Sequence, residues 1–152
     1  MFRRWRVKRA GSSFRLNLPD EERSLLRDLL PQLRELIATP PGDGDERIRR
    51  VFPTAYPDDA ELDAEYQRFM REELVASHTA AIERVEASLD RNELSEGELL
   101  SWMQSLNSVR LVLGTLLDVS EDGIDADADD PGYALYGYLS ALLEEMVHAI
   151  GT

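Results

Sequence analysis

The sequence of 152 residues has no cysteine and only two histidines. Without cysteine the chain can form no disulfide bond, no thiolate zinc site and no thiol redox switch of its own. The histidines, His78 and His148, leave few groups for acid–base catalysis near neutral pH. The sequence also lacks a Ser/His/Asp spacing, a phosphate-binding glycine loop and a two-histidine metal motif. We therefore expect a protein that is not an enzyme and has no cofactor and no metal.

Long apolar runs are missing as well. No segment reaches about 18 consecutive apolar residues, and the basic first ten residues are not followed by the apolar stretch of a signal peptide. We therefore expect a cytoplasmic protein without membrane contact. The length of the chain and its 43% hydrophobic residues suit a single domain over residues 1–152 with a core of its own.

Positive charge is scarce outside the N-terminus. The chain has 17 basic and 30 acidic residues, so its formal net charge is −13. This sign disfavours nucleic-acid binding over the whole surface. Residues 1–18 hold no acidic side chain and six basic ones. We call these six the basic set: Arg3, Arg4, Arg6, Lys8, Arg9 and Arg15.

Apolar residues alternate with the basic set, a pattern typical of two half-buried strands. It predicts a β-hairpin over residues 1–18 with a basic outer face. Trp5 and Phe14 should pack on helices, because a two-stranded hairpin alone is marginally stable. The outer face has two alternative partners: the phosphates of a nucleic acid, or an acidic protein surface.

Helical periodicity fills the rest of the chain, residues 19–152, and predicts a mainly α-helical bundle. A first helix begins near Pro19, and its apolar stripe consists of Leu26, Leu29, Leu33 and Ile37. Because the stripe keeps its phase across Pro31, we expect one helix kinked at that proline. A short helical turn should begin near Asp45, after a loop rich in proline and glycine. The longer predicted helices cover residues 59–90, 96–117 and 131–150. The first of these has one apolar face, formed by Leu62, Tyr66, Met70, Leu74, Ala81, Val85 and Leu89.

Two helix starts carry capping signals. Asp58 stands three residues before Glu61, and Ser95 stands three residues before Glu98. We expect Asp58 and Ser95 to be the N-caps of the helices that follow. The helix over 96–117 is apolar nearly all round, which predicts that it lies at the centre of the bundle.

That central helix also holds a polar pair, Asn107 and Arg110, on one stripe with Gly114. A buried charge must be paired. We expect Arg110 to meet a carboxylate near the start of the long helix, with Gly114 allowing a close approach of that partner's backbone. The alternative is an anion or partner-protein site organised by Arg110. The candidate carboxylates are Asp59, Glu61 and Glu65.

The acidic loop over residues 118–130 partly matches a calcium-binding EF-hand loop. Asp118, Ser120, Asp122 and Gly123 fall at loop positions 1, 3, 5 and 6. Asp129, however, is shorter than the glutamate normally found at position 12. We therefore favour a connector without a bound cation.

Three stretches together resemble one known family: Arg50–Asp59 continuing to Glu65–Arg68, Trp102 with Leu106–Gly114, and Tyr136–Leu143. They resemble the actinobacterial family of unknown function that includes the oxidative-stress regulator AosR. The segment from Asn107 to Gly114 is the most specific of the three. On this resemblance the candidate structural or partner-binding residues are Arg50, Tyr56, Asp58, Asp59, Trp102, Asn107, Arg110 and Gly114.

The resemblance implies a non-enzymatic regulator of transcription that acts through protein–protein contact with a sigma factor. Genes of the family often lie beside that of ClpS, which implies an alternative role as an accessory protein of Clp proteolysis. Direct DNA binding through the basic hairpin is a third possibility. A thiol redox switch does not carry over from the resemblance, because it needs reactive cysteines and this chain has none. The sequence does not indicate the stimulus or the oligomeric state.

Overall fold

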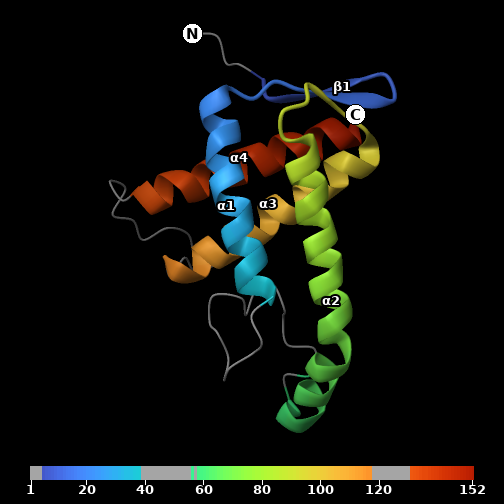
Figure 1. The fold of residues 1–152 in the computed structure, drawn as a ribbon, viewed down its shortest axis with the longest axis vertical. Coiled ribbons are helices and arrows are strands. Elements are labelled where there is room, and N and C mark those ends of the chain that lie inside the picture. The colour runs from blue at the N-terminus through green and yellow to red at the C-terminus, as the bar shows by residue number, and fades with distance from the viewer. Residues whose placement is uncertain (1–4, 39–55, 57, 118–130) are drawn as a thin grey trace.

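The computed structural model describes residues 5–38, 56, 58–117 and 131–152 (Figure 1). Within them the chain forms a mainly α-helical bundle with an N-terminal hairpin, as expected. The turn near Asp45 and the acidic loop over 118–130 lie outside the described residues. The elements are, in order, β1 (Val7–Ala10), β2 (Ser13–Leu16), α1 (Asp20–Ala38), α2 (Ala60–Ser88), β3 (Glu93–Leu94), α3 (Glu96–Leu116) and α4 (Pro131–Gly151).

The hairpin belongs to a small antiparallel sheet with the strand order β1-β2-β3. Gly11 has a φ of 66° between β1 and β2, a conformation that glycine adopts at little cost. The two-residue strand β3 pairs Leu94 with Phe14, and both side chains are fully buried. Sequence periodicity did not predict this third strand. Trp5, in contrast, is 39% exposed, so the expectation that it packs on the helices is wrong.

The helices form two layers that cross. Figure 1 shows α1 and α2 running alongside each other across α3 and α4, with the sheet over one end of the bundle. α3 contacts α1, α2 and α4, which agrees with its predicted central position. In the part of the chain that the structure describes, none of the helices combines the length and apolar character needed to cross a bilayer.

α3 begins at the predicted capping box. The Ser95 hydroxyl accepts a hydrogen bond from the backbone N–H of Glu98, and the Glu98 carboxylate accepts one from the N–H of Ser95. Further along, the buried indole of Trp102 donates to the hydroxyl of Ser88 on α2 at 2.8 Å. One side of α3 is open, because Leu100 is 50% exposed.

α1 is one continuous helix through Pro31, which faces solvent. A proline can be accommodated there because its ring and its missing N–H affect only one turn. The buried face follows Leu26, Leu30, Leu33 and Ile37. Leu29 was predicted on this face, but it is only half-buried.

α2 begins one residue later than predicted. Its N-cap is Asp59, whose extended backbone lets the carboxylate accept from the N–H of Leu62 at 3.0 Å. The assignment of Asp58 as the cap is therefore wrong. The apolar face predicted from Leu62 to Leu89 is buried only near the C-terminus of the helix. The buried residues of α2 all lie in its last two turns, at Ala81, Ile82, Val85 and Ser88.

A buried arginine on α1 fastens the sheet to the helices. Arg23 is only 6% exposed, and its guanidinium donates to the carbonyl oxygens of Leu18, Leu89 and Arg91. Weaker contacts reach the Leu16 carbonyl and the Asn92 amide oxygen. Leu89 and Arg91 follow the C-terminus of α2, where the helix dipole favours a cation. Backbone carbonyls thus replace the carboxylate that a buried arginine normally requires.

We predict that Arg23→Met lowers the free energy of unfolding by about 3 kcal/mol or more, because several buried carbonyls lose their donor. The matched control is Arg27→Met on the same helix. Arg27 forms only an exposed ion pair with Asp90, so its loss should cost less than about 1 kcal/mol. Urea denaturation followed by circular dichroism measures both. Equal losses in the two variants would show that Arg23 is not a structural clamp.

Candidate functional site

Two arginines of the basic hairpin, Arg6 and Arg9, contact other groups of the same chain. The Arg6 guanidinium forms a two-point ion pair with Glu22 at 2.7 and 3.2 Å and lies over the ring of Tyr138. Although burial raises the pKa of the Glu22 carboxyl, its hydrogen bonds, the strongest from Arg6, bring that pKa below its ordinary value. On α4, the Glu145 carboxylate accepts from the backbone N–H groups of Arg6 and Val7. The start of β1 therefore makes its polar contacts with other parts of the same chain.

Arg9 is also turned toward the body of the protein. Its guanidinium donates to the carbonyl oxygen of Ile150 at 3.0 Å and lies 4.8 Å from the ring centre of Phe14. Lys8 and Arg15 are exposed, whereas Arg3 and Arg4 lie outside the described residues. The outer face of the hairpin is therefore less basic than the sequence pattern predicted.

The Arg110 cluster has different partners from those predicted. Its guanidinium donates to the amide oxygen of Asn107 at 2.9 Å and to the hydroxyl of Tyr136 on α4 at 3.2 Å. The expected pairing with Asp59, Glu61 or Glu65 is wrong among the described residues, because Arg110 faces α4 and not the start of α2. Gly114 is buried on α3. The cluster joins two helices and leaves Arg110 half-buried.

The two histidines lie on different helices. His78 on α2 is half-buried, with its Nδ1 3.3 Å from the Ser108 hydroxyl on α3, and this burial lowers its pKa. His148 is exposed on α4. Among the described residues no three acidic or histidine side chains gather where they could hold a metal ion.

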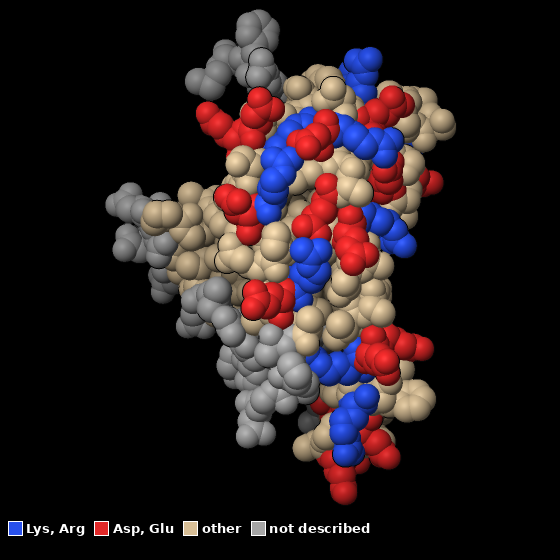
Figure 2. Space-filling view, viewed as in Figure 1, with Lys and Arg blue, Asp and Glu red and all other residues tan. Residues whose placement is uncertain are grey.

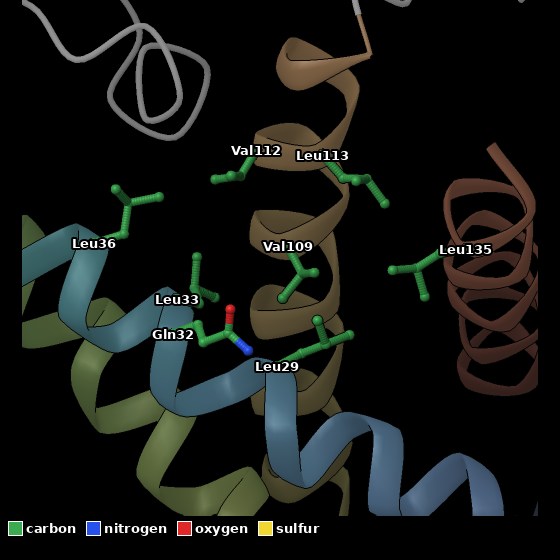
Figure 3. A pocket seen from close by; sticks show the side chains of 8 residues that line it. All are labelled: Leu29, Gln32, Leu33, Leu36, Val109, Val112, Leu113 and Leu135. Carbon is green, nitrogen blue, oxygen red and sulfur yellow. The ribbon is translucent and has the colours of Figure 1, made fainter. Parts of the chain in front are cut away.

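An apolar groove lies where α1, α3 and α4 meet, with a volume of about 200 Å³. Figure 3 shows the aliphatic side chains of the three helices converging on it, with the Gln32 amide at its side. Among the residues that the structure describes, those that line the groove carry no titratable side chain. Its lining residues are Leu29, Gln32, Leu33, Leu36, Val109, Val112, Leu113 and Leu135.

A second apolar surface lies on the N-terminal half of α2, which projects beyond the bundle (Figure 1). Phe69 is 83% exposed and Leu62 is 41% exposed. Tyr66 lies between them in sequence and stacks edge-on against the ring of Tyr56. Spacings of four and three residues place these side chains on one helix face. We call Leu62, Tyr66 and Phe69 the α2 stripe.

Sequence reasoning placed Leu62 and Tyr66 on the apolar face of the predicted helix and did not single out Phe69. Periodicity identifies an apolar helix face, but it does not distinguish a face that packs in the core from one that awaits a partner. An indirect signal was available, because Phe69 stands beside Met70 and extends the apolar surface beyond a single stripe.

Five further candidate residues remain to be placed. Tyr56, Asp58 and Asp59 lie at the start of α2, Trp102 lies in the core, and Arg50 lies outside the described residues. On the face shown in Figure 2, acidic and basic side chains are interspersed over α1 and α2, and both kinds reach the projecting end of α2.

The fold and its surfaces define a small helical protein with an apolar stripe turned outward. The chain matches, over residues 2–150, the protein family described as a domain of unknown function (DUF2017), and it belongs to that family. No curated protein and no solved structure matches it.

The lowered pKa of His78 makes stability depend on pH. In the unfolded chain histidine titrates near its ordinary value of about 6.5. Between that value and the lower pKa of the folded protein, the unfolded chain binds more protons, so stability falls as the pH falls. We predict that His78→Gln reduces the loss of stability between about pH 7.5 and about pH 5.5. Urea denaturation at both values tests this, with His148→Gln as the control. An unchanged pH dependence in His78→Gln would contradict it.

Proposed function

We propose that this protein is a non-enzymatic regulator in the cytoplasm that acts on transcription by binding a sigma factor of RNA polymerase. The sequence resemblance to the actinobacterial family of AosR supports this partner. The two apolar surfaces support partner binding better than catalysis, since among the described residues no group of catalytic side chains converges on either of them. The absence of cysteine means that any response to oxidants would have to come through the partner or through another signal.

The α2 stripe is the observation that carries this proposal. Contact of an exposed phenylalanine side chain with water is unfavourable. A partner that covers the side chain removes this apolar surface from water, which favours binding. Aromatic side chains are also frequent at the energetic centres of protein interfaces. The stripe sits on a projecting helix, so a partner can approach it from several sides.

The hairpin supports direct DNA binding less well. Arg6 and Arg9 contact groups of their own chain, and a cation that is already paired contributes less to phosphate binding. Mobility shifts on duplex DNA that appear at low salt and vanish on neutralising Arg3, Arg4 and Arg6 would favour this alternative over a protein partner.

We predict that the full-length protein, purified from its native cell with and without peroxide, retains an alternative sigma factor. Phe69→Ser and Leu62→Ser should each reduce that binding, by about tenfold or more for Phe69. The control is Leu100→Ser, which removes a half-exposed leucine from α3. Titration with the purified sigma factor measures the affinities.

Three other results would count against the proposal. Recovery of ClpS or Clp subunits in place of a sigma factor would favour the role in proteolysis. Recovery of neither would defeat both roles. Equal weakening by Leu100→Ser and Phe69→Ser would show that the α2 stripe is not the contact surface.

A further inference from the structure

The α2 stripe is bordered by acidic side chains. Glu65 and Glu72 each follow a stripe residue by three positions, and Glu73 follows Phe69 by four. Residues three and four apart are neighbours on a helix surface, so these carboxylates lie beside Leu62 and Phe69. All three glutamates are exposed. Ala76 extends the stripe, since it stands seven residues, or about two turns, after Phe69.

Two basic side chains, Arg68 and Arg71, lie in this part of α2. Arg71 donates to the carbonyl oxygen of Ile37, so it is directed toward α1. Arg68 is exposed and is turned about 100° from Phe69 around the helix, but it stands three residues after Glu65 and four before Glu72, so it adjoins both carboxylates. Among the described residues none of the three border glutamates forms an ion pair. Three carboxylates and one guanidinium, that of Arg68, thus lie along the stripe, so its border is negatively charged on balance.

A second copy of the chain is a poor partner for this surface. Each copy has a formal net charge of −13, and a symmetric contact would place glutamates of one stripe against those of the other. Like charges brought together in an interface disfavour the complex. A surface with lysine or arginine around an apolar centre would instead satisfy both features of the stripe.

Resting on the proposed function, we propose that the partner offers an apolar groove or helix face flanked by lysine or arginine, which covers Phe69 and Leu62 and pairs with Glu65, Glu72 and Glu73. The apolar contact supplies most of the affinity. The carboxylates supply orientation and a faster encounter, and both effects decline with salt because exposed charges are screened.

The test uses synthetic amphipathic helical peptides that share their apolar positions and differ only at the flanking positions, which are Lys, Gln or Glu. A scrambled Lys peptide of the same composition controls for non-specific attraction. Fluorescence anisotropy measures binding of each labelled peptide to the full-length protein. The Lys peptide should bind most tightly, and its affinity should fall with added salt and in Phe69→Ser.

Charge reversal locates the contact. Glu65→Lys with Glu72→Lys should weaken the Lys peptide by about tenfold at low salt. The control, Asp28→Lys with Glu144→Lys, changes the net charge equally at exposed sites on α1 and α4 and should leave binding unchanged. Circular dichroism confirms that all variants are folded.

Several outcomes would overturn the inference: no binding of the Lys peptide, equal binding of the Gln, Glu or scrambled peptides, or equal weakening by the control reversal. The two proposals fail separately. If the sigma factor binds through Phe69 but neither charge reversal nor salt affects it, the proposed function stands and the basic partner surface is wrong. If the peptides behave as expected and no sigma factor binds, the partner chemistry stands and the sigma factor is wrong.

Discussion

The guanidinium of Arg23 links parts of the fold that are distant in sequence, alongside the strand pairing of β2 with β3 and the apolar core. It binds carbonyl oxygens from the end of β2, from the link into α1 and from the turn after α2. That turn leads directly into β3, so the same side chain positions the third strand against β2. Because the N–H groups of a guanidinium lie in one plane at fixed angles, the side chain fixes the directions as well as the distances at which the carbonyl oxygens approach it. The sheet and the helical layers are thus joined at one buried point.

This anchorage explains how α2 can be buried at one end and exposed at the other. Its last turns pack in the core and end at the Arg23 contacts, and the Trp102–Ser88 hydrogen bond ties them to α3. The first turns need no comparable support, since a long helix whose base is packed continues along its own backbone hydrogen bonds. An exposed apolar stripe can therefore be held away from the bundle and presented to another molecule.

Local patterns predicted the helices because caps and periodicity are short-range. The capping box at Ser95 and the helix that starts at Pro131 were found where the sequence placed them. The role of Arg23 had no such signal, because an arginine near the acidic start of a helix reads as a surface residue and its carbonyl partners are distant in sequence. The exposure of Phe69 was missed for a related reason. Apolar periodicity identifies an apolar helix face, and only the arrangement of the other helices shows whether that face is covered.

Hydrogen–deuterium exchange of the full-length protein, with and without the purified sigma factor, tests the central claim most directly. If the α2 stripe is the contact surface, backbone amides within residues 60–78 should exchange more slowly in the complex, and those of α3 should be unchanged. Slower exchange confined to the hairpin residues 7–16, with α2 unaffected, would contradict the account.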